Sequence, residues 1–406
     1  MIPVERALEI TLAAAAEKST ANRMPAEPVL LQESLGRILR EDIVADSDYP
    51  RFDKAIRDGY AVCFEDTARL PAVLEVLGVS RAGQRADVTV ERGACCEIMT
   101  GAPLPTGANA VVMVEHTEAI DASHVRVLRT VREGEGLLRQ AAELHFGENI
   151  LDSGKRISLG DIGALASVGK SEVRVSRKPR VAILATGDEL VEVRESPQPD
   201  QIRNSNSYTL HAQVVGAGAE PVLLGIGRDN VEDLRAKIGE GLKHDILLVS
   251  GGVSMGKYDF VEDVFAEFGV KVLFDSVAMK PGKPTVFGLR GDTFVFGLPG
   301  NPVSTIVAFR MFVIPVIRSL LKVGESEPTT LRAQLEVVTK CDSARTAIVP
   351  ALVRFDGQSY RIRSAPWKGS SDLAGLSRAN AMVVLPQTEG SLQAGDWVDF
   401  LLLESM

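Results

Sequence analysis

Cysteine is scarce in this chain of 406 residues, and histidine is almost as scarce. The four cysteines are Cys63, the adjacent Cys95 and Cys96, and Cys341, and none of them has the CxxC spacing of a zinc or redox site. We therefore expect free, reduced thiols in a cytoplasmic protein. The five histidines are scattered along the sequence, which does not favour a histidine metal centre or a catalytic histidine.

The sequence also has no excess of positive charge and no obvious targeting segment. Its 45 basic and 54 acidic residues give a net charge of −9, whereas broad nucleic-acid binding needs a basic face. A small anionic ligand is not excluded, because a few local lysines and backbone N–H groups can hold one. We expect no apolar run of the ~18 residues that a membrane span needs. The N-terminal "MIPVERALEITLAAAAEK" has an early acid and a helical pattern, unlike a signal peptide.

The length allows two to four domains, and the patterning changes along the chain. Residues 3–18 predict an amphipathic helix, and residues 40–62 are polar and extended. Between about 70 and 145, short Val- and Leu-rich runs separated by Gly, Pro and Asn predict strands. Residues 160–175 predict a short helix followed by a strand.

A different pattern begins at residue 179, where apolar runs alternate with helical segments. This alternation predicts a parallel sheet covered by helices on both faces. After a linker near 322–328, residues 329–406 return to short strands and predict a small β-barrel. The expected fold class is thus multi-domain α/β plus β, with an α/β parallel-sheet domain, β-rich domains and a C-terminal β-barrel.

The predicted strands of the α/β region end in glycine, acidic or lysine residues. Ligands of open α/β sheets bind at the carboxyl ends of the strands. The segments at these ends are Gly187-Asp188-Glu189, Arg228-Asp229, Gly252 through Asp259, "MKPGKP" with Lys280 and Lys283, and "LPGNP" at 298–302.

These residue types fit phosphate chemistry with magnesium. Glycines let the backbone approach an anion closely, and Lys280 and Lys283 add positive charge. The carboxylates Glu189, Asp229 and Asp259 would repel an anion unless a hard cation such as Mg²⁺ lay between them.

Each of these residues also has a purely structural explanation. Asp259, three residues before Glu262, has the spacing of a helix cap, and Asp229 before "NVEDL" could cap a helix as well. The two lysines could be solvated residues of a Pro/Gly loop. Their joint occurrence at strand ends favours the functional interpretation.

Six segments carry a family resemblance. They are "FDKAIRDGYAV" (52–62), "EIMTGAPLPTGANAVVMVE" (97–115), "ATGDEL" (185–190), "VSGGVSMGKYDF" (249–260), "MKPGKP" (279–284) and "GLPGNPVS" (297–304). In this order they resemble the molybdopterin molybdenumtransferases, the family that includes the gephyrin E domain.

The resemblance implies an elongated four-domain homodimer. Its expected domains are an α/β domain at 1–26 and 177–325, a linking domain at 27–45 and 146–176, a β-rich domain at 46–145 that completes the partner's site, and a barrel at 326–406.

The resemblance further implies a reaction and its site residues. Molybdate is inserted into adenylylated molybdopterin, with Mg²⁺-dependent release of AMP. Molybdopterin adenylyltransferase and the downstream molybdoenzyme machinery are implied as partners, with no nucleic acid and no membrane. The implied catalytic residues are Asp259, Asp229, Glu189 and Lys280, and the first three are also the implied metal ligands. The implied substrate-binding residues are Asp58, Thr100, Glu143, Arg139, Gly251, Gly252, Ser254, Lys283, Pro299, Pro302 and Ser370.

The chain departs from the family pattern at several positions. The family usually has "FDNSAMDGYA", but Lys54 to Arg57 replace the four residues before Asp58. Ser276 stands where a lysine is frequent, Glu143 where aspartate is usual, and "SARTAIVP" (343–350) replaces an arginine-containing segment, while "KGSSDL" (368–373) keeps its Gly-Ser pair. Two alternatives therefore stay open: a catalytically altered paralogue that acts as a molybdopterin-binding or scaffold protein, and a molybdopterin adenylyltransferase.

Overall fold

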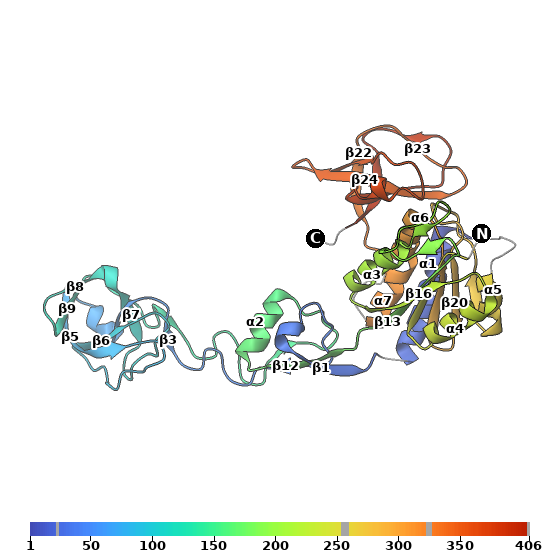
Figure 1. Ribbon diagram of the computed structural model, residues 1–406. Coiled ribbons are helices and arrows are strands. Elements are labelled where there is room, and N and C mark those ends of the chain that lie inside the picture. The colour runs from blue at the N-terminus through green and yellow to red at the C-terminus, as the bar shows by residue number, and fades with distance from the viewer. Residues whose placement is uncertain (22–23, 253–259, 322–326, 404–406) are drawn as a thin grey trace.

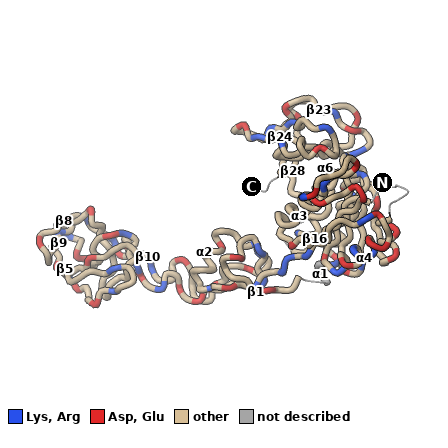
Figure 2. Tube along the Cα trace, in the orientation of Figure 1, with Lys and Arg blue, Asp and Glu red and all other residues tan. Residues whose placement is uncertain are grey.

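The computed structural model describes residues 1–21, 24–252, 260–321 and 327–403. The molecule is elongated (Figure 1): a body formed by an α/β sheet carries the C-terminal barrel, and an arm extends away from it. Lys and Arg are interspersed with Asp and Glu in the body, the barrel and the arm (Figure 2). The multi-domain α/β plus β fold class is confirmed.

The body is built on a six-stranded sheet of order β16-β13-β17-β21-β20-β18. The strands are β13 (Arg180–Thr186), β16 (Glu220–Gly227), β17 (Ile246–Ser250), β18 (Lys271–Phe274), β20 (Val286–Arg290) and β21 (Thr293–Leu298). Five of them run in the same direction, and β20 is antiparallel to both of its neighbours, β21 and β18. The expectation of a wholly parallel sheet was therefore wrong at β20. This strand forms a hairpin with β21 through Gly291 and Asp292, a Gly-Asp turn between two apolar runs.

Helices cover both faces of the sheet, as predicted (Figure 1). One face packs against α1 (Val4–Ala21), α3 (Asn206–Gly216), α6 (Pro302–Ala308) and α7 (Ile314–Leu321), and the other against α4 (Val231–Gly241) and α5 (Phe260–Glu267). The cores contain apolar residues at helical spacing, such as Leu234 with Ile238 and Leu210 with Val214, which is why these segments fold as amphipathic helices.

Residues Pro302–Leu321 form a long apolar helical stretch in which the π-helical turn η4 (Phe309–Val313) separates α6 from α7. By length and composition it could cross a membrane, so the expectation of no such run was wrong. In this structure 78% of its most apolar 18-residue window is buried, and the stretch lies in the core of the body.

The C-terminal region forms a closed five-stranded barrel, because β24 pairs with both β25 and β26 and thereby closes the order β24-β25-β22-β28-β26. Its strands are β22 (Leu331–Leu335), β24 (Thr346–Phe355), β25 (Tyr360–Ser364), β26 (Ala381–Leu385) and β28 (Trp397–Leu402), and β23 (Thr339–Lys340), β27 (Ser391–Leu392) and α8 (Leu373–Leu376) accompany them. One strand from the body, β19 (Met279–Lys280), adds to β24.

The arm has two parts. We call the part next to the body the linking region: β1 (Ala26–Leu30), η1 (Leu31–Glu33), β2 (Ile43–Val44), β11 (Asn149–Leu151), α2 (Leu159–Ser167) and β12 (Glu172–Ser176). We call the remainder the arm end: β3 (Lys54–Ala55), β4 (Gly59–Val62), η2 (Phe64–Thr67), β5 (Ala72–Ser80), β6 (Ala94–Ile98), β7 (Ala110–Met113), η3 (Val114–His116), β8 (Thr117–Ala119), β9 (His124–Val127) and β10 (Leu137–Leu138). Each part has its own apolar core. Figure 1 shows the arm end on the far side of the linking region from the body.

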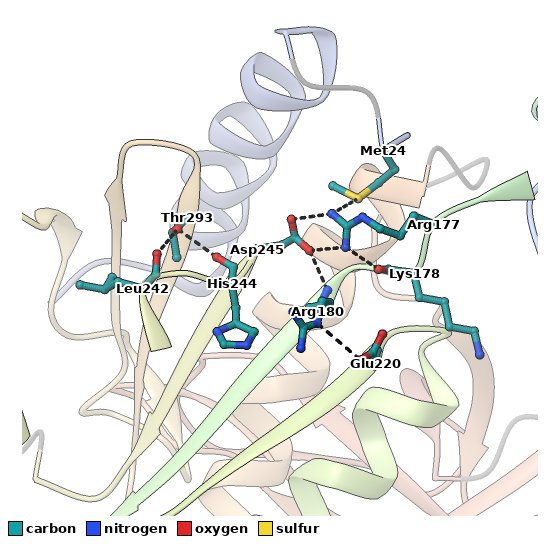
Figure 3. A network of polar contacts seen from close by, with 9 residues as sticks. All are labelled: Met24, Arg177, Lys178, Arg180, Glu220, Leu242, His244, Asp245 and Thr293. Atoms are coloured by element: carbon teal, nitrogen blue, oxygen red, sulfur yellow. Dashed lines mark hydrogen bonds and ion pairs between the residues drawn. The ribbon is translucent and has the colours of Figure 1, made fainter. Parts of the chain in front are cut away.

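Arg177, the residue after β12, ties the linking region to the body. Its guanidinium donates to both carboxylate oxygens of Asp245 at 3.0 Å, and Asp245 also accepts the N–H of Arg180 at 2.7 Å (Figure 3). Asp245 immediately precedes β17. This bidentate ion pair therefore holds the base of the arm against the amino ends of the sheet strands.

Candidate functional site

A cleft of about 760 Å³ lies at the carboxyl ends of the parallel strands. Its walls come from the segments that follow β13, β16, β17 and β21, from the start of α3, and from the barrel-side loop before α8. Six of the predicted site residues line it: Glu189, Asp229, Gly251, Gly252, Pro299 and Pro302. Residues far apart in the sequence thus meet at one edge of the sheet, where open α/β sheets bind their ligands.

Two strand ends are held together by acidic side chains. Asp229 Oδ2 accepts the backbone N–H of Asp188 at 3.3 Å, and Asp188 Oδ1 accepts the backbone N–H of Asp229 at 3.2 Å. Arg228 Nη1 donates to the carbonyl oxygens of Asp188 and Leu190, both at 3.3 Å. The segments after β13 and β16 therefore form one acidic wall, which also carries Glu189.

The capping explanation for Asp229 does not hold. The residue that caps α4 is Asn230, whose side chain accepts the N–H of Asp233 at 2.9 Å. Asp229 lies one position too early, so its carboxylate takes no part in the cap and lines the cleft instead. Asp259 and Ser254 lie outside the described residues. Whether Asp259 caps a helix or belongs to the site therefore stays a prediction from the sequence.

Gly251 shows why the loop after β17 needs glycine. Its φ is +94°, and a Cβ at this position would lie 2.5 Å from the carbonyl oxygen of Thr186. Without a Cβ, the end of β17 can pass directly beside the end of β13. The glycine therefore sets the shape of the cleft floor.

Gly251→Ala is expected to lower the free energy of unfolding by at least about 1–3 kcal/mol. An alanine would be strained at this positive φ, and its Cβ would also clash with the backbone of Thr186. A matched control is Gly93→Ala, with φ +84° and no atom within 4 Å of the place that a Cβ would take, which isolates the strain. Denaturant unfolding of both variants measures the difference. Equal losses for the two would show that the close approach of Gly251 to Thr186 costs nothing.

The two predicted lysines do not line the cleft. Lys280 lies on β19 and donates to Asp342 of the barrel at 3.1 Å, and its side chain is half exposed. The backbone oxygen of Lys283 accepts N–H groups of Val277 and Thr285. Ser370 does not line the cleft either, but its neighbour Ser371 does. The carbonyl oxygen of Ser370 accepts the N–H of Val303 at 2.9 Å.

Four predicted residues lie in the arm. Asp58 accepts two hydrogen bonds from Thr100, at 2.7 Å from its backbone N–H and 2.9 Å from its hydroxyl. These bonds, the backbone one foremost, lower the pKa of Asp58. Arg139 donates to Asp53 at 2.7 Å, and Glu143 donates its backbone N–H to Tyr49 at 2.9 Å. The structure thus brings Asp58 and Thr100 together, and none of the four residues lines the cleft of its own chain.

The substituted segment before Asp58 is well accommodated. Ala55 is buried in the arm-end core, and Lys54 lies over the ring of Tyr49 with 5.7 Å between Nζ and the ring centroid. Ile56 and Arg57 are exposed next to Asp58. The departures therefore change the surface around Asp58 rather than the fold of the arm end.

Sequence reasoning missed several polar residues that line the cleft: Thr186, Arg203, Asn204, Ser205, Asn206, Ser250 and Asn301. Most belong to "RNSNS" (203–207), which extends from the end of β15 (Ile202–Arg203), the partner of β14 (Leu190–Val191), into the start of α3. A cluster of asparagine and serine before a helix was the available signal, because these residues favour helix starts and helix starts at strand ends are frequent anion sites.

The donor set of the cleft fits magnesium. Mg²⁺ prefers oxygen ligands and is usually held by one or two carboxylates together with water and substrate phosphates. Glu189 and Asp229 supply two carboxylates on adjoining strand ends. Among the described residues no group of three His, Cys, Asp or Glu side chains suits a metal, so these two do not form a closed protein cage.

Comparisons with known proteins cover nearly the whole chain. Family models match as "MoeA N-terminal region (domain I and II)" over residues 2–169, "Probable molybdopterin binding domain" over 182–319 and "MoeA C-terminal region (domain IV)" over 332–403. Proteins named molybdopterin molybdenumtransferase from Bacillus subtilis and a Nostoc species are 35% and 37% identical, over 93% of this chain and 90% and 88% of theirs. A crystal structure of a molybdopterin biosynthesis moeA protein from Pyrococcus horikoshii aligns over 100% of both chains, with a TM-score of 0.81 and 30% identity.

Fold and cleft define a multi-domain α/β and β protein with a candidate ligand site at the strand ends of its body. Relatives that are more than 30% identical and are matched over about nine tenths of their own length show its family. The chain belongs to the molybdopterin molybdenumtransferase family, transferases of molybdenum cofactor biosynthesis.

Proposed function

We propose that this chain inserts molybdate into adenylylated molybdopterin with Mg²⁺-dependent release of AMP, forming the molybdenum cofactor. The observation that carries the proposal is the meeting of Glu189 and Asp229, from two different strand ends, in one cleft with the glycines of the β17 loop. A phosphate group and a divalent cation are the ligands that this combination of carboxylates, glycines and a helix start accommodates together.

The residues of this chain have distinct tasks in the proposed reaction. Glu189 and Asp229 would hold the cation, and the two hydrogen bonds in which Asp188 and Asp229 each donate a backbone N–H to the other's carboxylate keep their segments together. Ser205 and Asn206 at the start of α3 line the cleft, and the N-terminus of a helix favours negative charge, so it would orient the phosphate. The bound Mg²⁺ would polarise the phosphoanhydride.

We further propose that the working unit is a homodimer in which the arm end of one subunit completes the cleft of the other. The arm holds Asp58 hydrogen-bonded to Thr100 on an exposed surface, and the arm extends away from the body (Figure 1). A partner arm offers these groups a way to meet a ligand bound at the strand ends. Arg177, clamped on Asp245, would set the direction in which the arm leaves the body.

The decisive experiment is incubation with adenylylated molybdopterin, molybdate and Mg²⁺. AMP release together with cofactor formation, both absent when Mg²⁺ is chelated, is the expected result. Tight binding of the substrate without turnover would contradict the proposal and favour a binding or scaffold role.

A further inference from the structure

The apolar helical stretch Pro302–Leu321 contains only two charged residues, Arg310 and Arg318. Arg310 belongs to the π-turn η4, and such turns inside α-helices are frequent at functional sites. In the described part of the chain neither guanidinium is paired with a carboxylate, and burial followed by repulsion from another arginine lowers the pKa of each. The presence of Arg310 among buried apolar residues therefore needs an explanation other than an ion pair.

Arg310 holds the last strand of the barrel. Its Nη1 donates to the carbonyl oxygen of Leu402, at the end of β28, and its Nη2 donates to that of the next residue, Leu403. Two neighbouring carbonyls suit the planar fork of an arginine better than the single nitrogen of a lysine. Replacing a buried charge by an apolar residue of similar size is often neutral or stabilising, so stability alone does not account for an arginine here.

The strand end that Arg310 holds is connected to the barrel-side wall of the cleft. The backbone N–H of Leu403 donates to the carbonyl oxygen of Asn380 at 3.0 Å, and Asn380 follows α8 by four residues. Ser371 and Leu373, at the start of α8, line the cleft. A short, hydrogen-bonded path thus leads from the guanidinium to the wall.

The same wall rests on the body at a second point. The carbonyl oxygen of Ser370 accepts the N–H of Val303, in the first turn of α6, at 2.9 Å. Leu376 of α8 and Met382 of β26 are buried in the core of the body. Because Val303 and Arg310 belong to one helical stretch, a single element of the body supports the wall at both points.

We propose that Arg310 is a positioning residue of the enzyme, which fixes the barrel on the body so that Ser371 and Leu373 meet the ligand. Arg310 does not line the cleft, so it acts through β28 and α8. The inference rests on the proposed function only in that the cleft holds the substrate of that reaction. It gives the two directed hydrogen bonds of a buried cation a task in the geometry of the site.

A distance measurement between body and barrel tests the positioning directly. The native cysteines are buried, so spin labels at the exposed sites Glu232→Cys on α4 and Gln358→Cys in the barrel can be attached selectively. Dilution with unlabelled subunits restricts the measurement to distances within one chain. Pulsed electron paramagnetic resonance should show one narrow distribution for the parent and a shifted or broader one for Arg310→Met. Arg310→Lys, which keeps a donor, should lie between them.

Steady-state kinetics separates positioning from general stability. Arg310→Met is expected to raise the KM for adenylylated molybdopterin about three- to tenfold and to change kcat less than about twofold, because the displaced wall contacts the ligand without taking part in the chemistry. Arg310→Lys should recover part of the loss.

The matched control is Arg318→Met, the same substitution in the same helical stretch. Arg318 Nη1 donates to the carbonyl oxygen of Glu327 and the hydroxyl of Thr329, at 2.8 and 2.9 Å, in the segment that leads to β22. These bonds do not reach α8. We therefore expect Arg318→Met to lower the thermal midpoint and to leave KM and the distance distribution unchanged.

The inference is overturned if Arg310→Met leaves either the distance distribution or KM as in the parent, or if both methionine variants raise KM equally. The proposed reaction is judged separately, by AMP release from adenylylated molybdopterin by the parent. Turnover that is indifferent to Arg310→Met would remove only this inference. Without turnover in the parent, the proposed reaction falls, and the distance distribution together with the Kd of adenylylated molybdopterin still decides whether Arg310 positions the barrel.

Discussion

Asp229→Asn is expected to lower the turnover number at least about a hundredfold while leaving the protein as stable as the parent. The amide keeps the size of the side chain and an oxygen that can accept the N–H of Asp188, so the link between the two strand ends survives. It removes the negative charge that would hold a cation beside Glu189. Since Asp188 and Asp229 approach each other closely, losing one charge also relieves repulsion between them. AMP release under saturating Mg²⁺ and substrate measures the effect.

The adjacent residue provides a control with the opposite profile. Asn230 caps α4 through Asp233, and Asn230→Ala is expected to lower the free energy of unfolding by ~1 kcal/mol while turnover stays within about twofold. Two neighbouring substitutions would thus separate chemistry from folding. Activity of Asp229→Asn within threefold of the parent would mean that this carboxylate has no part in the reaction.

The body of the fold was predictable because its signals are local. Strands such as β17, "ILLVS", are buried on both faces and read as continuous apolar runs, and α4 shows its buried face at helical spacing. Strand β20 was missed because its partner lies just across the Gly291-Asp292 turn, and only the hairpin signal, not the alternation of strands and helices, would have revealed it. The addition of β19 to the barrel depends on pairing with Thr346 and Ala347, far along the chain, and had no local signal.

The site shows the same division between local and long-range information. Glu189 and Asp229 could be placed together because both follow predicted strands, and the carboxyl ends of parallel strands meet at one edge. Lys280 was expected there for the same reason, but its segment leaves the sheet for the barrel, where Asp342 pairs with it. Asn206 went unnoticed because its role depends on Gly300 and Ser250, which only the folded chain brings to it.

The proposed homodimer, in which each arm completes the partner's cleft, leads to a prediction that a site within a single chain does not make. Asp58→Asn and Asp229→Asn are each expected to be nearly inactive as homodimers. When the two variants are co-expressed with different tags and the mixed dimer is purified, one of its two clefts combines an intact body with an intact partner arm. The mixed dimer should therefore regain about half of the parent turnover per dimer, because twofold symmetry creates two equivalent sites.

The reciprocal dimer pairs a parent subunit with the double variant Asp58→Asn/Asp229→Asn. If clefts are shared between subunits, each cleft of this dimer contains one damaged contribution, and turnover should be nearly absent. If each cleft used only its own arm, the results would be exchanged: about half of the parent turnover in this dimer, and none in the dimer of single variants. The two dimers contain the same substitutions in the same number, so differences in stability or expression cannot produce the exchange. Equal activity of the two dimers would show that Asp58 and Asp229 do not contribute to a common site.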